Sequence, residues 1–350
     1  MSEAYRDAGV DIDAQERALA RIKKLVKKTR TRGVLADVGA FGGLFRPDLH
    51  GMNEPVLVAS ADGVGTKLAV ARLAGDYSTV GADLVNHCVN DVLAQGALPL
   101  FFLDYVGTGV LDPEAVVELV AGVARGCRAN GCALLGGELA EMPGFYRPGD
   151  HELVGFIVGL VDRGRLLDGS RVRPGDVLVG LPSAGLHTNG YSLARRVLFD
   201  RLGLAAGDPI PGLESRKSVA EHLLMPHLSY LKPLRPLLGH PALHALVHVT
   251  GGGLTDNLPR VLPRRCHALV RLGSWPIPEL FTALQRHGEI DDEEMLRVFN
   301  MGLGMVLVVD PQGLAEVLAA LRKGRQKALP IGTVQKGAEG VAYDFTLAGE

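Results

Sequence analysis

The sequence has almost no excess of charge of either sign. Its 350 residues include 37 Lys and Arg against 39 Asp and Glu, a formal net charge of −2. A protein dedicated to nucleic-acid binding normally contains a strongly basic domain, so the balance disfavours that class. Residues 17–32 are a local exception, with eight basic side chains, no acidic one and apolar residues at helical spacing. A solvated basic helix face is the simplest interpretation, a phosphate contact is the alternative, and nucleic acid is least favoured.

Cysteine and long apolar runs are also scarce. The four cysteines form no CxxC pair and no spacing typical of zinc ligands, so we interpret them as buried, reduced side chains: Cys88, Cys127, Cys132 and Cys266. No apolar run approaches the roughly 20 residues of a membrane span. The first residues, MSEAYRDAGVDID, are polar and acidic, unlike a secretory signal. We therefore expect a cytoplasmic protein without a membrane partner.

Glycine, in contrast, is abundant. The chain has 45 glycines, about 13% where about 7% is usual. They occur in short, dissimilar clusters after apolar runs, which excludes a collagen-like repeat. With 47% hydrophobic and 22% charged residues, the chain can bury a sizeable core and is not expected to be disordered as a whole.

Hydrophobic periodicity predicts alternating strands and helices in both halves. The first half is expected to contain strands at 55–61, 98–106, 132–135 and 153–161, and helices at 79–96 and 112–130. The second half is expected to contain helices at 190–202 and 219–238, and strands at 177–181, 244–249, 268–272, 303–309, 331–334 and 341–345.

A segment rich in Gly, Arg and Asp at 162–175 interrupts the apolar pattern, and we place a domain boundary there. The expected fold class is therefore α/β (α+β) with two domains, at residues 1–165 and 172–345.

The loop DGVGTK follows the first expected strand. Gly63 and Gly65 let backbone amides approach a ligand, Lys67 adds a positive charge beside Thr66, and Asp62 could hold a divalent metal on phosphate oxygens. The order of residues matches neither a Walker A loop nor the Rossmann spacing. A structural tight turn and a magnesium–phosphate site therefore both remain open.

A polar stripe runs along the helix expected at 79–96. Asp83, His87 and Asp91 recur every four residues and therefore project from one face. A solvated face would explain this spacing, but a buried stripe with two carboxylates would favour a metal. Asp91 is the preferred ligand.

Three further loops follow apolar strands. In 136–144, Gly137 and Glu138 fit either a ligand contact or an ordinary polar loop. In 183–192, His187 precedes an expected helix N-terminus and could meet an anion, although a structural His is the more usual case. After His248, Gly251 and Gly252 belong to three consecutive glycines, which favour close backbone contact with a ligand over a simple turn.

Together, these segments resemble the phosphoribosylformylglycinamidine cyclo-ligases, the aminoimidazole ribonucleotide synthetases of purine biosynthesis. The resemblance extends in order from about Tyr5 to Val334 and rests on eight segments: YRDAGVDIDA (5–14), RIKKLVKKTRTRGV (21–34), DGVGTKL (62–68), CVNDVLAQGALPLFFLDYVGTG (88–109), GGELAEMPGFY (136–146), HTNGYSL (187–193), HVTGGGLTDNLPRVLP (248–263) and FNMGLGM (299–305). Leu139 stands where the family usually has a threonine hydroxyl, and any role of that hydroxyl is then lost.

The resemblance implies an ATP- and Mg²⁺-dependent ligase that closes the ring of formylglycinamidine ribonucleotide to give 5-aminoimidazole ribonucleotide. It implies a homodimer in which the N-terminal domain, which binds ATP, contributes strands to a central eight-stranded barrel, beside a C-terminal α/β domain with a mixed sheet. Lys23, Asp62, Asp91 and His187 match the family's proposed active-site positions, with His248 nearby. The hypothetical roles are Mg²⁺ ligands for the two acids, ATP phosphate contacts for Lys23 and Lys67, and proton transfer or charge stabilisation for His187.

Two alternatives stay open at this level. Another enzyme of the same superfamily, such as thiamine-monophosphate kinase, fits the size of the chain, although the FFLDY and HVTGGG segments fit it poorly. A nucleotide-binding subunit without catalysis is disfavoured because the acids, Lys23 and His187 are all present.

Overall fold

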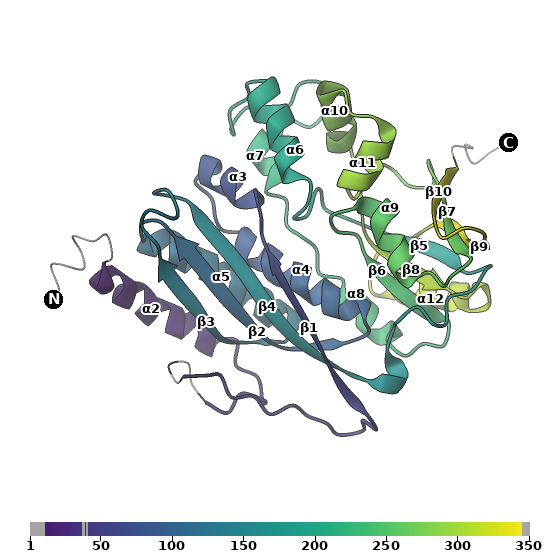
Figure 1. Ribbon diagram of the computed structural model, residues 1–350, viewed down its shortest axis with the longest axis horizontal. Helices are drawn as coiled ribbons and strands as arrows, with labels where there is room; N and C mark the ends of the chain where they lie inside the picture. The colour runs from purple at the N-terminus through teal and green to yellow at the C-terminus, as the bar shows by residue number, and fades with distance from the viewer. Residues whose placement is uncertain (1–10, 37–38, 40, 345–350) are drawn as a thin grey trace.

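The computed structural model describes residues 11–36, 39 and 41–344, so residues 5–10 of the first matching segment lie outside the described part. Two sheets, each with helices packed on it, lie side by side, and the chain completes one before it enters the other (Figure 1). This arrangement confirms the expected α/β class. No described helix is long and apolar enough to span a membrane.

The first sheet has four strands in the order β1-β4-β2-β3, of which only β2 and β3 run parallel. Helices α4 and α5 cover one of its faces, and α2 packs along α5 (Figure 1). The elements are α2 (Ile12–Lys27), β1 (Pro55–Gly63), α3 (Lys67–Ala74), α4 (Val80–Ala94), β2 (Leu98–Thr108), α5 (Pro113–Asn130), β3 (Ala133–Glu141) and β4 (His151–Asp162).

Glycine allows α4 and α5 to approach each other closely. A Cβ on Gly81 would lie 2.1 Å from the carbonyl oxygen of Leu119, and one on Gly126 would lie 2.8 Å from Cβ of Val85. Because real Cβ atoms do not come so close to such atoms, larger residues would push the helices apart. The close packing fixes the position of α4, which bears the polar stripe.

The second sheet has six strands in the order β10-β7-β9-β5-β8-β6, and it is mixed. Short helices surround it. The elements are 3-10 turn η1 (Arg163–Arg165), β5 (Val177–Pro182), α6 (Tyr191–Arg195), π-helical turn η2 (Arg196–Arg201), α7 (Val219–Leu223), α8 (Leu231–Leu234), 3-10 turn η3 (Arg235–Leu237), β6 (Leu243–His248), α9 (Gly253–Asn257), 3-10 turn η4 (Leu258–Val261), β7 (Cys266–Arg271), α10 (Glu279–Gly288), α11 (Asp292–Val298), β8 (Leu303–Val309), 3-10 turn η5 (Pro311–Gly313), α12 (Leu314–Lys323), β9 (Leu329–Lys336) and β10 (Gly340–Asp344).

The prediction of a single helix at 219–238 is wrong. The structure has α7, an irregular segment at 224–230, then α8 and a 3-10 turn. Pro226, Pro233 and Pro236 lack the backbone N–H that a helix interior requires, and their rings clash with the preceding turn. The apolar residues keep helical spacing across these prolines, and the prediction of one continuous helix rested on that spacing alone.

The loop expected at 136–144 is also partly wrong, because β3 continues through Glu141. Gly137 pairs with Asp104 of β2, and a Cβ there would lie 2.0 Å from Oδ1 of Asp104. Glycine at this position therefore has a packing reason: it lets β3 pass the Asp104 carboxyl.

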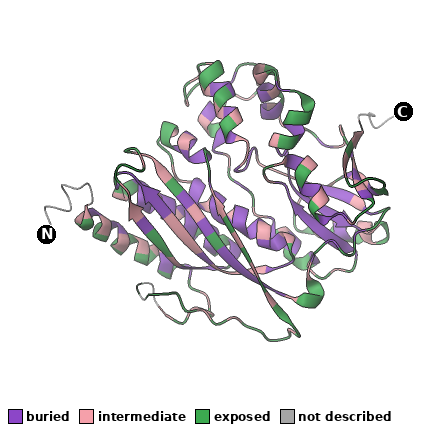
Figure 2. Ribbon diagram, viewed as in Figure 1, coloured by how far each residue is buried: buried purple, intermediate pink, exposed green. Residues whose placement is uncertain are grey.

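Helix α4 lies between the two halves of the molecule. Its outer side packs against β6 and α8, so residues on almost every side of it are buried, as Figure 2 shows for the centre of the molecule. The buried set includes three polar side chains: Asp83, His87 and Asn90. The predicted stripe is thus directed into a junction rather than into solvent, apart from the half-buried Asp91.

Candidate functional site

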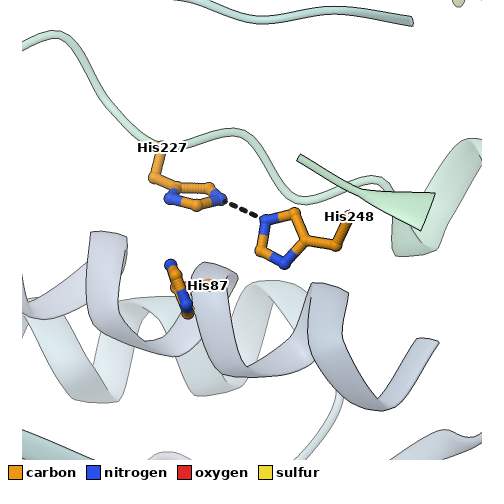
Figure 3. A group of neighbouring side chains, drawn as sticks. All are labelled: His87, His227 and His248. Carbon is orange, nitrogen blue, oxygen red and sulfur yellow. Dashed lines mark hydrogen bonds between the residues drawn. The ribbon is translucent and has the colours of Figure 1, made fainter. Parts of the chain in front are cut away.

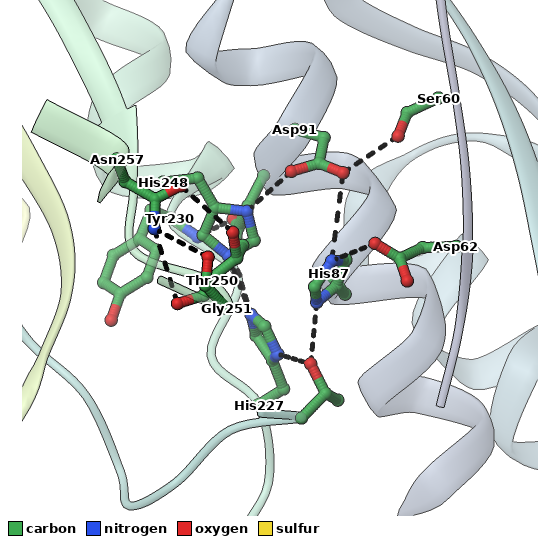
Figure 4. Close-up of polar contacts among 12 residues, drawn as sticks. Ser60, Asp62, His87, Asp91, His227, Tyr230, His248, Thr250, Gly251 and Asn257 are labelled. Carbon is green, nitrogen blue, oxygen red and sulfur yellow. Dashed lines mark hydrogen bonds and ion pairs between the residues drawn. The ribbon is translucent and has the colours of Figure 1, made fainter. Parts of the chain in front are cut away.

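Two carboxylate–imidazole pairs, Asp62–His87 and Asp91–His248, lie at the junction, where α4 meets the second half of the molecule (Figure 4). We call these four residues the carboxylate centre. Asp62, at the end of β1, accepts from Nε2 of His87 at 2.6 Å. Asp91 accepts from Nδ1 of His248 at 2.8 Å, and its other oxygen accepts from the Ser60 hydroxyl at 2.8 Å. The sequence predictions for Asp62, Asp91 and His248 therefore meet in one place, since β1, α4 and the end of β6 converge there.

These contacts set the charge of the site. Burial opposes ionisation of Asp62 and Asp91, but the hydrogen bonds from His87 and His248 outweigh it and lower the pKa of each carboxyl. For His87, burial is likewise outweighed by its bond to Asp62, and its pKa is raised. Burial prevails at His248 and lowers its pKa in spite of Asp91. The centre thus has two ionised carboxylates that remain 41% and 27% exposed.

Lys67 has a different place from the one expected. Its side chain is fully buried, and its ammonium forms an ion pair with Asp83 at 2.6 Å. It also donates to the carbonyl oxygens of His187 at 3.3 Å and Met225 at 2.8 Å. In this structure Lys67 therefore ties the start of α3 and α4 to two loops of the second half, rather than facing open space.

His187 lies behind the carboxylate centre. Its φ is 62°, an uncommon left-handed conformation for a residue other than glycine. Its ring stacks on His227, with 4.0 Å between the ring centroids, and Nε2 accepts from the backbone N–H of Ala184 at 3.3 Å. Burial, with His248 and Lys67 nearby, lowers its pKa well below the ordinary value, so the imidazole is neutral.

The glycine run after His248 turns beside the carboxylate centre. Asn257 donates to the carbonyl oxygens of Thr250, Gly251 and Gly253, which fixes the turn. Gly252 has a φ of 98°, so its glycine has a conformational reason. Neither backbone conformation nor packing requires glycine at position 251, because a Cβ there would meet only the Asn189 side chain, at 3.3 Å. Gly251 is therefore the glycine best placed for contact with a ligand.

A cleft of about 250 Å³ opens onto this centre. It lies between β1, the end of α4 and the β6–α9 turn, and the charged and polar residues in its wall are Ser60, Asp91, Gln95, His248, Thr250, Asn257 and Arg260.

Not all predicted residues meet here. Lys23 is exposed on α2 and lines a separate cleft of about 290 Å³ with Lys27 and Arg30. Gly137 and Glu138 lie on β3 and line other hollows, near Asp104. Gly63, Gly65 and Thr66 follow Asp62, and Thr66 lies within hydrogen-bond distance of Ser192 at 3.3 Å. Within the described residues, Lys23 and the Gly137–Glu138 pair are therefore apart from the carboxylate centre.

His227 was not predicted from the sequence, and Thr188 and Asn90 had no role assigned to them. His227 lies in the irregular segment after Pro226, and its ring contacts the rings of His87, His187 and His248. Thr188 and Asn90 each contact a ring nitrogen of His227. The proline before His227 was the available signal, because it indicates a break that frees the next side chain from a helix face.

Comparisons with known proteins define the class first. Two family models match: "AIR synthase related protein, N-terminal domain" at residues 48–161 and "AIR synthase related protein, C-terminal domain" at residues 173–344. Together they span most of the chain, which therefore belongs to the AIR synthase related family. A thiamine-monophosphate kinase structure from Stenotrophomonas maltophilia has a similar fold, with a TM-score of 0.67 and 20% identity over 95% of this chain and 96% of that one.

Closer relatives specify the branch. The phosphoribosylformylglycinamidine cyclo-ligase of Nitratidesulfovibrio vulgaris is 51% identical over 99% of this chain and 98% of its own length. That of Trichlorobacter lovleyi is 49% identical over 95% and 94%. The resemblance seen in the sequence is thus confirmed.

Proposed function

We propose that this protein catalyses the ATP-dependent ring closure of formylglycinamidine ribonucleotide to 5-aminoimidazole ribonucleotide, with release of ADP and phosphate. The observation that carries this proposal is the identity of about half of all residues with cyclo-ligases along nearly the whole of both chains. The fold alone would not select it, since the kinase named above has a similar one at only 20% identity.

The chemistry needs activation of a poor leaving group. ATP phosphorylates the formamide oxygen, and the amidine nitrogen then attacks the activated carbon while the C–O bond to phosphate breaks. Phosphoryl transfer depends mostly on positioning and on stabilisation of charge. Asp91 and His248 of the carboxylate centre line one cleft with Thr250, the residue before Gly251, and this arrangement is suited to that task.

Asp62 and Asp91 are the proposed Mg²⁺ ligands. Their carboxylate oxygens and a nitrogen of His87 lie within 4.8 Å of one another, and both acids are ionised and partly exposed. Hard carboxylate oxygens suit Mg²⁺, which when bound would neutralise phosphate charge. The set of donors therefore fits the ion.

His248, held by Asp91, and the neutral His187 behind it are the proposed groups for proton transfer or charge stabilisation at the amidine. The Lys67 ammonium is buried in its ion pair with Asp83 and does not point into the cleft. We therefore propose that Lys67 positions the His187 loop. Lys23 remains a proposed phosphate contact, supported by the basic wall of its own cleft.

We also propose a homodimer in the cytoplasm, joined through the face of the first sheet that none of the described helices covers (Figure 1). Leu57 on β1 is 64% exposed and Phe156 on β4 is 40% exposed on adjacent strands. An apolar sheet face of this kind is typical of an interface. Pairing of two such sheets would give the eight-stranded barrel that the family resemblance implies.

The test is product formation by the purified protein. We expect ring-closed product and phosphate in equal amounts, only when ATP, Mg²⁺ and formylglycinamidine ribonucleotide are all present. Thiamine monophosphate should give no phosphorylated product. Turnover of thiamine monophosphate, or binding of ATP without turnover of either substrate, would contradict the proposal.

A further inference from the structure

Three buried histidines from three separate segments meet behind the carboxylate centre (Figure 3). His87 comes from α4, His227 from the irregular segment after Pro226, and His248 from the end of β6. They are 3%, 1% and 6% exposed. One nitrogen of each lies within 4.8 Å of one nitrogen of each of the others.

The closest pair of nitrogens already has a metal-ligand spacing. Nε2 of His227 and Nε2 of His248 are 3.2 Å apart. Two imidazoles on a tetrahedral zinc, each at roughly 2.0–2.1 Å, have their nitrogens about 3.3 Å apart. No large movement is needed to place one ion between these two rings.

The hydrogen bonds around the pair show which nitrogens carry lone pairs. Asn90 accepts from the backbone N–H of Tyr230 at 2.9 Å and donates to the carbonyl oxygen of Leu228 at 2.8 Å, which fixes the orientation of its amide. Its NH₂ group therefore points at Nε2 of His227, 3.1 Å away, and that nitrogen is an acceptor. His248 donates Nδ1–H to Asp91, which leaves the lone pair of its neutral ring on Nε2.

Two acceptor nitrogens then lie 3.2 Å apart in a buried place with no proton between them, an arrangement that a bound cation relieves; on His227 the cation would replace the N–H of Asn90. His87 can complete the set. In its neutral form it donates Nε2–H to Asp62 and has its lone pair on Nδ1, where the Thr188 hydroxyl lies at 2.7 Å. Both Asp62 and Asp91 thus orient an imidazole as carboxylates do behind zinc-bound histidines.

We propose that His87, His227 and His248 form a binding site for a borderline transition-metal cation, with Zn²⁺ as the reference ion. A site of three imidazoles suits zinc, copper or nickel, whereas Mg²⁺ prefers oxygen ligands. Three protein ligands leave a fourth position for water. The site is therefore distinct in chemistry from the proposed Mg²⁺ site, although the two share the Asp62 and Asp91 neighbours.

The bound ion would link α4 to two segments of the second half and would occupy Nε2 of His248, the ring nitrogen that Asp91 leaves available for proton transfer. Zinc is thus expected to inhibit ring closure while it stabilises the fold. Binding itself is measured without reference to activity, so failure of the metal site and failure of the proposed enzymatic function are distinguishable.

The test is zinc binding by His227→Gln, since His227 has no place in the proposed reaction. Equilibrium dialysis of the full-length protein, with metal analysis, should give one Zn²⁺ per wild-type chain in the presence of millimolar Mg²⁺. His227→Gln should weaken binding at least about 100-fold, because it removes a ligand itself, whereas loss of a group that only hydrogen-bonds a ligand costs about 10–100-fold. The control is His240→Gln, whose imidazole contacts Glu316 outside the junction and should leave binding unchanged.

Two measurements keep the test decisive. A melting curve of metal-free His227→Gln shows whether it folds; if it does not, X-ray absorption of the zinc-loaded wild type must show three imidazole nitrogens around the metal. Zinc that survives His227→Gln but is lost in Asp62→Asn would lie on the Asp62–His87–Asp91 group instead, and would overturn the proposal. An oxygen-rich metal shell, or no stoichiometric binding, would overturn it as well.

Discussion

Two acids in the first half differ because of their neighbours. Asp91 is paired with His248 and Ser60, which favour its ionised form, and its pKa is lowered. Asp104, beside Gly137 on the helix side of the sheet, has no cation near it among the described residues, and burial raises its pKa to about 7. A carboxyl whose pKa is higher in the folded protein than in the unfolded chain binds more protons when folded, so it destabilises the fold as pH rises.

Asp104→Asn should therefore stabilise the protein, and more so at high pH. The wild-type carboxyl begins to destabilise the folded protein as the pH rises above its ordinary pKa of 3.8, and the full destabilisation is reached only above about pH 7. At about 1.4 kcal/mol per pKa unit, with allowance for partial exposure, we expect a gain on the order of 2 kcal/mol at pH 8 and a smaller one at pH 5. Urea unfolding at both values measures it. An equal gain at pH 5 and pH 8 would show that Asp104 is not the titrating group.

The glycines of the β6–α9 turn make a second prediction at this scale. Gly251→Ala adds a methyl group to an unstrained position beside the cleft, so it should weaken ATP or substrate binding about tenfold or more with a small change in Tm. Gly252→Ala places alanine at a φ of 98°, so it should lower stability by about 1 kcal/mol or more. Calorimetry and isothermal titration separate the two effects. A large fall in Tm for Gly251→Ala with normal affinity would assign that glycine to structure alone.

At the scale of elements, long segments with regular periodicity could be predicted from the sequence, whereas segments decided by single residues could not. The strand ending at Asp62 and helix α4 were predicted, since their apolar spacing is continuous. The helix at 219–238 failed because its prolines outweigh its spacing, and His227 was missed with it. The pairs Asp62–His87 and Asp91–His248 depend on contacts up to 157 residues apart, which no local pattern contains.

The buried Lys67–Asp83 ion pair joins α3 to α4, and both groups also bond loops of the second half. Lys67 donates to the carbonyl oxygens of His187 and Met225, and Asp83 accepts from the backbone N–H of His227. Breaking such a buried pair by Lys67→Met leaves an uncompensated carboxylate and should cost about 3–5 kcal/mol. The double variant Lys67→Met/Asp83→Leu should recover part of this loss, since no charge is then left buried. Chemical denaturation of the two single variants and the double variant gives the coupling energy. A double variant as unstable as the sum of the singles would mean that the two groups do not interact.

At the scale of the whole molecule, the first half has helices on one side of its sheet and an apolar surface on the other. Phe156 lies near the middle of β4, and Leu57 lies on the neighbouring strand β1. The described helices cover one face; on the other, Leu57 and Phe156 stay exposed, and we propose that a second copy pairs there.

Leu57→Lys should convert the dimer to a monomer, because two ammonium groups would be buried in the pairing of the sheets. Leu73→Lys is the matched control, since Leu73 is 58% exposed on α3 and lies outside the sheet. Light scattering after size exclusion gives the mass of each. Wild-type protein that is monomeric at micromolar concentration, or a Leu57→Lys variant that stays dimeric, would contradict the proposed interface.

The central claim, that ATP activates the formamide oxygen for ring closure, is tested most directly by isotope transfer. Formylglycinamidine ribonucleotide labelled with ¹⁸O in the formyl group is converted with unlabelled ATP, and the released phosphate is analysed by mass spectrometry. If the oxygen is phosphorylated and then leaves, each phosphate released with product contains one ¹⁸O. Unlabelled phosphate, with the ¹⁸O found in water or retained by the nucleotide, would contradict the account.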